Sequence, residues 1–387
     1  MIRAAVVALV ATTTAGCGGA AAGQGAPGTP ASAPVAAVAP GLEVTLRQAA
    51  RSTRADDDAI VVERRLVEVR GGAESLALGG LGNEITALTV RALDGVPFDV
   101  LTQTRDAAGP RLTVRTPRAG RRLVELTYTL HGLRWRAEHE LVRAPGASEL
   151  TLDTVIAVND DAGRDLRDAR VSVVVSDDAG SLRRFVLAAP LSVQGAATVR
   201  VPFAHREHVP VADVVRLEAT EADLDLATRE LEPFYGTRPA PARARRELRL
   251  TGVSDLPTGQ ARLSEPSPEG VPRLVAAGTL DVELAAGSPG VAAFALGPAT
   301  GLRAERRRAG YTMDAHHMVE RFEVHVASTS DGPTAVLVRE PLYRTPRWRI
   351  VRESVSHVVV GERTIELPVS VGGHGRATVS YAVEYVW

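Results

Sequence analysis

Two histidine clusters are the residues whose types and spacing come nearest to a metal site. One places His205 and His208 three positions apart, and the other is the adjacent pair His316 and His317. A zinc site needs three or four convergent ligands, and two histidines at that spacing converge on one face of a helix. The flanking residues alternate as in an extended chain. We therefore expect both clusters to face solvent, with a metal-dependent enzyme as the alternative.

Three oxygen-bearing side chains in a short acidic segment, Asn159, Asp161 and Asp165, are the pattern closest to a calcium loop. Hard cations bind oxygen ligands from neighbouring loop positions. However, Gly163 is not where an EF-hand loop requires its glycine, and no glutamate follows at the spacing of the bidentate ligand. We expect a hairpin turn rich in Asp and Asn at this place.

Nucleophilic and phosphate-transfer chemistry find little support in the sequence. The only cysteine is Cys17, and neither a Gly-x-Ser-x-Gly nor a Walker A motif is present. The 45 basic residues are all arginine, so a phosphate-binding lysine is absent as well. A carboxylate pair for glycoside cleavage stays open, but aromatic residues, which stack on sugar rings, make up only 4% of the chain. The sequence predicts no cofactor and leaves a hydrolase as an alternative only.

One short basic run, from Arg303 to Arg308, is the strongest local concentration of charge. It could contact lipid phosphates or an acidic partner, but we expect it to be a solvated edge between strand and loop. The whole chain has a formal net charge of -1, which gives no basic excess for nucleic acid. The sequence therefore predicts no nucleic-acid partner.

Residues 1–16 have the layout of a secretory signal peptide. Arg3 precedes an apolar run, and small residues then lead up to Cys17. The four residues from Thr14 to Cys17 resemble the lipobox of bacterial lipoproteins, although that family prefers leucine where Thr14 stands. The resemblance implies that Cys17 carries a lipid, which holds the protein on a membrane. Gly18 then favours the outer membrane, by analogy with enterobacterial sorting.

Residues 17–41 are expected to be a lipidated tether. They consist almost entirely of Ala, Gly, Pro, Ser, Thr and Val, without a periodic pattern. Such a composition cannot bury enough apolar surface to offset the entropy of the chain. The sequence thus predicts a disordered spacer that links the folded part to the bacterial cell envelope, facing the periplasm or the cell surface.

The rest of the chain alternates between apolar and polar residues with period two, and turn residues separate the runs. We expect an all-β fold of tandem antiparallel β-sandwiches with immunoglobulin-like domains. The predicted domains are 42–236 and 247–387, joined by a connector rich in Pro and Arg. The segment 218–232 is ambiguous between helix and strand. The apolar positions expected on single strand faces include Val124, Leu126, Tyr128 and Leu130, then Phe322, Val324 and Val326, and finally Val379, Tyr381, Val383 and Tyr385.

Several segments together resemble a known family. They are the stretch around Trp135, the run 154–173 with its acidic turn, the segment 340–350 and the strand that ends at Trp387. In this order and spacing they are similar to an uncharacterised domain of mucoidy-inhibitor-A-like bacterial envelope proteins, over Ala59 to Trp387. The resemblance implies a β-rich envelope protein and no established reaction.

These observations predict a membrane-tethered envelope lipoprotein that binds another component without catalysis. Its expected partners are the membrane, through the lipid on Cys17, and an envelope protein or polysaccharide. One alternative is an envelope hydrolase or metal-dependent enzyme that uses His205, His208 or the Asp-rich turns. A purely structural lipoprotein is another. The tryptophans, Trp135, Trp348 and Trp387, are expected in the core rather than on a ligand platform.

Overall fold

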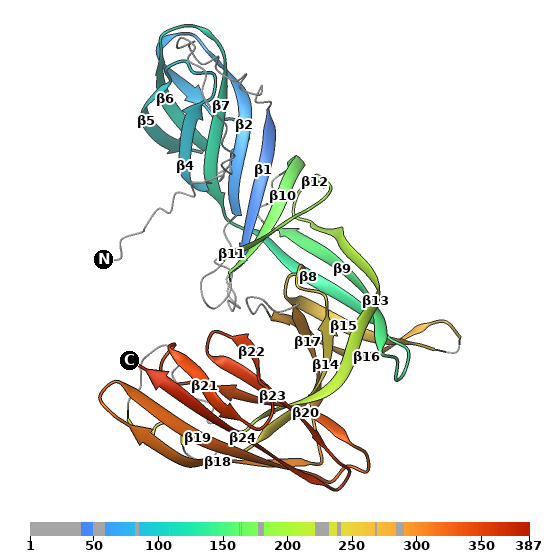
Figure 1. Cartoon of the computed structure of the whole chain (residues 1–387). Helices are drawn as coiled ribbons and strands as arrows, with labels where there is room; N and C mark the ends of the chain where they lie inside the picture. The colour runs from blue at the N-terminus through green and yellow to red at the C-terminus, as the bar shows by residue number, and fades with distance from the viewer. Residues whose placement is uncertain are drawn as a thin grey trace, which may run out of the picture. The chain divides into compact units, whose positions relative to one another are not determined.

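The alternation of apolar and polar residues becomes β-strand structure along the folded part of the chain. The computed structural model describes residues 40–48, 59–81, 85–107, 109–161, 163, 165–176, 182–220, 232–237, 241–267, 269–283 and 290–387. These residues belong to one compact unit, Pro40–Trp387, and form strands β1 to β24 and no helix (Figure 1). The predicted all-β fold is confirmed.

Two sheets are built mainly from the first half of this unit. The seven-stranded sheet has the order β11 (Leu182–Val186), β10 (Leu166–Ser176), β1 (Gly41–Gln48), β2 (Ala59–Val69), β7 (Gly120–Leu130) and β4 (Ile85–Ala92), with β12 (Leu191–Val193) paired to β10. The three-stranded sheet has the order β3 (Gly72–Ala77), β6 (Gly109–Thr116) and β5 (Asp99–Asp106). On β7 the four predicted core positions are all buried, so the alternation identifies its inner face correctly.

The largest sheet contains strands from both halves of the sequence. Its order is β14 (Arg243–Thr251), β17 (Val291–Pro298), β16 (Pro272–Glu283), β15 (Gly259–Pro266), β8 (Leu133–Val142), β9 (Glu149–Asp160), β13 (Thr198–Glu218), β20 (Thr334–Pro341), β23 (Thr364–Val371) and β22 (Val358–Gly361). Because β14 also pairs with β13, the seven strands from β14 to β13 close into a ring. The remaining three strands, β20, β23 and β22, extend from β13 outside that ring.

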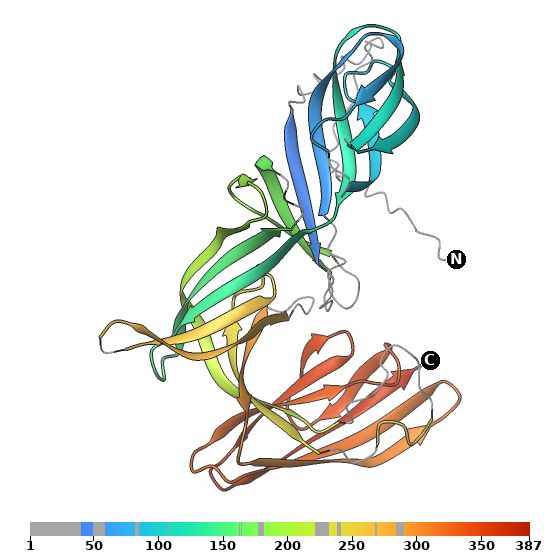
Figure 2. The same ribbon diagram turned by 180° about the vertical axis from the view of Figure 1, so that it is seen from behind.

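Strand β13 joins these parts because its 21 residues have several successive partners. Its first half pairs with β9, and its second half pairs with β14 on one edge and with β20 on the other. Figures 1 and 2 show it as one long curved strand. Most strand pairs in the protein are antiparallel, whereas β13 with β20, β8 with β15 and β1 with β10 are parallel.

A four-stranded sheet completes the fold, with the order β18 (Leu302–Met313), β19 (His317–Ser328), β24 (Arg376–Val386) and β21 (Trp348–Glu353). Together with β20 and β23 it encloses the C-terminal core, in which the predicted faces of β19 and β24 are buried. Two further clusters lie in the seven-stranded sheet region and inside the ring. Fully buried members of the three clusters include Leu46, Ile85 and Leu126, then Leu248 and Phe294, and then Phe322, Tyr343 and Tyr385.

The tryptophans divide between core and periphery. Trp135 is 5% exposed and belongs to the core of the first region, as predicted. Trp348 and Trp387 are only half-buried and pack against the edge of the C-terminal core. The expectation of a core position is therefore only partly met for these two residues.

The immunoglobulin-like character and the domain boundaries stay predictions. The ten-stranded sheet contains strands from both sides of the predicted connector.

In the segment predicted as helix or strand, Glu218 ends β13, and residues 221–231 lie outside the described residues. The predicted signal peptide, 1–16, and residues 17–39 of the predicted tether lie outside them as well. None of the described residues forms a helix long and apolar enough to span a membrane.

Candidate functional site

His205 and His208 lie on β13, where each pairs with a different carboxylate of β9. His205 Nδ1 lies 2.6 Å from Asp153 Oδ1, and His208 Nδ1 lies 2.8 Å from Glu149 Oε2. The hydrogen bond and the charge of Asp153 raise the pKa of His205 above its ordinary value. His205 Nε2 also lies 3.6 Å from Glu207 Oε1. Both histidines are thus exposed polar residues of a sheet surface that pair with neighbouring carboxylates.

His316 lies in the turn before β19, and His317 is the first residue of that strand; both lie next to one aspartate. Their backbone N–H groups donate to Asp314 Oδ1 at 2.8 and 2.9 Å, and His317 Nδ1 lies 2.6 Å from Asp314 Oδ2. These backbone bonds, the largest cause, and the neighbouring His317 lower the pKa of Asp314. The arrangement is that of a turn held by its own aspartate.

The acidic segment between β9 and β10 is not the hairpin turn that the sequence predicts, because β9 pairs with β8 and β13, whereas β10 pairs with β1, β11 and β12. Asn159 Nδ2 donates to Asp161 Oδ1 at 2.5 Å, and Arg134 pairs with Asp161 at 2.9 Å. Asp165 accepts a bond from the backbone N–H of Gly195 at 3.2 Å. Within the described ranges, no three His, Cys, Asp or Glu side chains are grouped as ligands of a metal ion.

The basic run 303–308 lies on β18, which sends its arginines to opposite faces. Arg303 and Arg307 are exposed, whereas the side chains of Arg306 and Arg308 are only 4% and 11% exposed. The prediction of a solvated edge is therefore wrong for Arg306 and Arg308. Successive side chains of a strand point to opposite faces, and one face of β18 covers the C-terminal core.

Two fully buried glutamates balance most of this buried charge. Arg306 Nε lies 2.8 Å from Glu340 Oε2, and Arg308 Nη1 lies 3.0 Å from Glu320 Oε1. Burial is the largest single influence on Arg306 and by itself lowers its pKa, but Glu340, Tyr381 and Tyr343 together outweigh it, so the pKa of Arg306 lies well above its ordinary value. Arg344, which is also fully buried, binds Glu320 through two hydrogen bonds.

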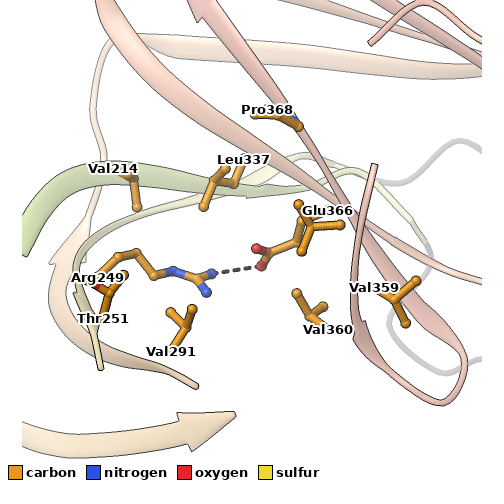
Figure 3. A pocket seen from close by; sticks show the side chains of 10 residues that line it. Val214, Arg249, Thr251, Val291, Leu337, Val359, Val360, Glu366 and Pro368 are labelled. Carbon is orange, nitrogen blue, oxygen red and sulfur yellow. Dashed lines mark hydrogen bonds and ion pairs between the residues drawn. The ribbon is translucent and has the colours of Figure 1, made fainter. Parts of the chain in front are cut away.

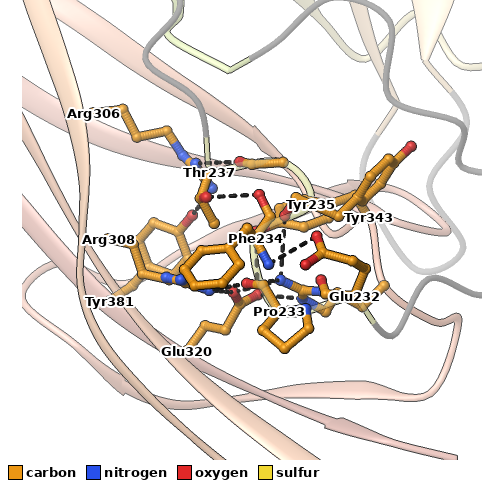
Figure 4. Close-up of polar contacts among 12 residues, drawn as sticks. Glu232, Pro233, Phe234, Tyr235, Thr237, Arg306, Arg308, Glu320, Tyr343 and Tyr381 are labelled. Atoms are coloured by element: carbon orange, nitrogen blue, oxygen red, sulfur yellow. Dashed lines mark hydrogen bonds and ion pairs between the residues drawn. The ribbon is translucent and has the colours of Figure 1, made fainter.

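The three arginines, Arg306, Arg308 and Arg344, also hold the turn 232–237. Figure 4 shows Arg306, Arg308 and Glu320 beside this turn. They outnumber the two glutamates, and carbonyl dipoles of the turn satisfy the remaining donors. Their backbone acceptors are the carbonyl oxygens of Glu232, Pro233, Tyr235 and Gly236. We interpret this buried arginine network as a structural anchor, because its charges are paired with buried glutamates and bonded to carbonyl oxygens of the turn.

An apolar recess lies between the ring and the strands that extend from β13. This valine recess has a volume of about 220 Å³. Figure 3 shows Val291 and Val360 beside an Arg249–Glu366 pair in its wall. Two of its residues on the edge strand β22, Val358 and Val359, are 51% and 41% exposed. The remaining lining residues are Val214, Thr251, Leu337 and Pro368.

The charged groups in this wall are balanced internally. Arg249 Nη2 lies 2.7 Å from Glu366 Oε1, and the two side chains are 7% and 5% exposed. Arg249 also lies 3.2 Å from Glu247, and Arg339 lies 3.6 Å from Glu366. Because each buried charge faces an opposite one, the recess offers an apolar surface without a free charge.

Neither Arg249 nor Glu366 is among the residues predicted from the sequence. Leu248 and Leu250 flank Arg249, and Ile365 and Leu367 flank Glu366. Such alternation by itself predicts that the charged side chain faces solvent. The covered face of each strand, and the side chain that each charge meets, follow only from the pairing of β14, β13, β20 and β23.

Cys17, the predicted lipidation site, lies outside the described residues. No family model matches the chain. No curated protein matches it in sequence. The resemblance to mucoidy-inhibitor-A-like proteins therefore stays a prediction from the sequence.

Proposed function

We propose that this protein is a membrane-tethered binding module of the bacterial envelope that acts without catalysis. The observation that carries the proposal is the valine recess, an apolar concave surface with two exposed valines at its rim and no free charge. Burial of apolar surface is the main favourable contribution to most protein association. An exposed apolar recess of this kind suits the reception of an apolar group from a partner.

The size of the recess limits what it can receive. Pockets for drug-sized ligands commonly measure about 300 to 1,000 Å³, and this recess measures about 220 Å³. One large apolar side chain, presented by an envelope protein, fits better than a complete cofactor or an oligosaccharide. Membrane attachment would come from the lipid on Cys17, and the pattern around Cys17 and Gly18 supports an outer-membrane location facing the periplasm or the cell surface.

In-cell photocrosslinking tests the binding module directly. A photoreactive residue at Val359 of the full-length protein should give a defined adduct with an envelope protein. The same residue at Val186, which is 65% exposed on β11 and lies outside the recess, should not give that adduct. Identical adducts from both positions, or none from Val359, would refute binding at the recess.

The tether is tested separately by replacing the predicted lipidation site. Cys17→Ala should move the protein from the membrane fraction to the soluble fraction and reduce the adduct formed at Val359. If the variant stays in the membrane fraction, Cys17 is not the anchor. That result would leave the assignment of the recess untouched, because the adduct at Val359 reports on it independently.

A further inference from the structure

A second recess lies on another part of the ten-stranded sheet. It has a volume of about 270 Å³ and is formed by β13, β14, the start of β20 and two turns at 299–302 and 330–333. We call it the Arg246 recess. Its polar lining consists of Asp213, Arg246, Glu247, Thr300, Ser330 and Thr334.

The two carboxylates of this recess are already neutralised. Asp213 Oδ2 lies 2.7 Å from Arg143 Nη2. Glu247, which is 2% exposed, lies 3.0 Å from Arg216 and 3.2 Å from Arg249. These pairs leave no carboxylate available to Arg246.

Arg246 itself is exposed, and no described residue forms an ion pair or a side-chain hydrogen bond with it. A guanidinium presents planar donors that match the two oxygens of a carboxylate or a phosphate. The recess therefore combines a concave surface with a positive charge that no described residue compensates. Charge complementarity favours an anion as its ligand.

Three hydroxyl groups add hydrogen-bonding capacity around this charge. Thr300, Ser330 and Thr334 line the recess, and none of their hydroxyls is bonded to a described residue. A hydroxyl hydrogen rotates to suit its partner, so each can donate to an anionic oxygen. Apolar lining residues, including Leu296, Leu302 and Pro333, can contact the carbon skeleton that carries the anion.

We infer that the Arg246 recess binds the oxyanion of a small acidic group, a carboxylate or a phosphate, on an envelope component. Arg246 supplies the charge, and the three hydroxyls supply additional donors. The inference is independent of the valine recess, because it rests on Arg246 and on the two turns, none of which lines that recess. It would give the tethered module a second, polar contact.

Chemical-shift titration of the full-length protein tests the inference. Inorganic phosphate and acetate are titrated separately at constant ionic strength, with the backbone amides of Thr300 and Ser330 as reporters. At least one anion should give saturable shifts at these amides. Phosphate alone would identify a phosphate site, and acetate alone a carboxylate site.

Two variants separate a specific site from diffuse surface charge. Arg246→Gln should weaken binding about tenfold or more, since a hydrogen bond to a charged group is lost. Arg245→Gln is the matched control, because Arg245 is the exposed neighbour on β14 and does not line the recess. Equal weakening by both variants, or no saturable shift with either anion, would overturn the inference. A Ser330→Ala variant should weaken binding without a change in the thermal unfolding midpoint.

Discussion

Arg344 and Glu320 form a doubly hydrogen-bonded ion pair in which neither side chain is exposed to solvent. Arg344 Nε donates to Glu320 Oε2 at 2.8 Å, and Nη2 donates to Oε1 at 2.9 Å. Tyr343 also donates to Glu320, at 3.2 Å, and burial together with the charge of Glu320 raises the pKa of that phenol. Glu320 thus joins β19, β18 and the segment after β20 in the interior of the C-terminal core.

Removing this carboxylate should be strongly destabilising. Glu320→Gln leaves Arg344 and Arg308 buried without their main counter-charge, and breaking a buried ion pair in this way costs about 3 to 5 kcal/mol. Urea unfolding of the variant measures the loss. The matched control is Glu323→Gln on the same strand, whose pair with Arg307 is at the surface and should leave the urea midpoint nearly unchanged. Equal effects of the two substitutions would contradict the buried network.

The stability of the protein should fall in mild acid because of His139. His139 is buried, its Nδ1 lies 2.9 Å from Thr154 Oγ1, and its Nε2 lies 3.0 Å from the carbonyl oxygen of Pro257. The carbonyl can only accept, so Nε2 carries the proton and Thr154 donates to Nδ1. Burial lowers the pKa of His139 from 6.5 to about 4, so the folded protein holds the neutral form.

The direction of this pH effect follows from the difference between the pKa of His139 in the folded and in the unfolded protein. A histidine whose pKa is lower in the folded state stabilises the protein fully above pH 6.5 and loses that contribution as the pH falls toward 4. The loss should reach about 2 to 3 kcal/mol at pH 4.5. Unfolding free energies of the wild type and of His139→Gln between pH 7.5 and 4.5 measure it as a difference. Parallel pH curves for the two proteins would show that His139 is not the cause.

The tryptophans should differ in their contribution to stability. Trp135→Ala should cost about 3 to 5 kcal/mol, because the ring is buried and its removal leaves a cavity. Trp348→Ala should cost less, about 1 to 3 kcal/mol, since the ring is half-buried and its Nε1–H donates to the carbonyl of Glu362. Thermal or urea unfolding of both variants checks the order, and the reverse order would disagree with the packing.

Gly236 should not tolerate a side chain. Its φ is +69°, and a Cβ atom would lie 2.6 Å from the ring of Tyr343. Left-handed backbone strain and the clash together should cost about 2 to 4 kcal/mol in Gly236→Ala. Gly195→Ala is the control, because Gly195 has a φ of +64° and open space around it, so only the backbone strain of about 1 to 2 kcal/mol applies. A comparable loss for both variants would argue against the contact with Tyr343.

Reducing agents should have no effect on folding. The chain has one cysteine, which cannot form a disulfide within the chain. A fragment that begins at Leu42 should therefore show the same thermal midpoint with and without reductant. That fragment contains no cysteine, so a midpoint that moves with reductant would contradict the expectation.

The sequence by itself determined the local structure of this protein. On strands such as β7, β19 and β24, apolar residues recur at most second positions, with the buried Glu320 of β19 as an exception, and the period of two indicates which face is buried. Residues such as Phe322 and Tyr381 could be assigned to the core for this reason alone. The all-β class followed in the same way, because it depends on periodicity within each segment and not on which segments meet.

Only the tertiary structure decided the partners. The arginines of 303–308 are predicted to lie at the surface, yet Arg306 meets Glu340 in the interior, since one face of β18 packs against strands distant in the sequence. The closed ring of seven strands and the Arg249–Glu366 pair depend on long-range pairing in the same way. Alternation indicates which side chains of a strand share a face, but hydrogen bonds between backbones are the same for every sequence, so pairing is settled by how the side chains of all strands pack together.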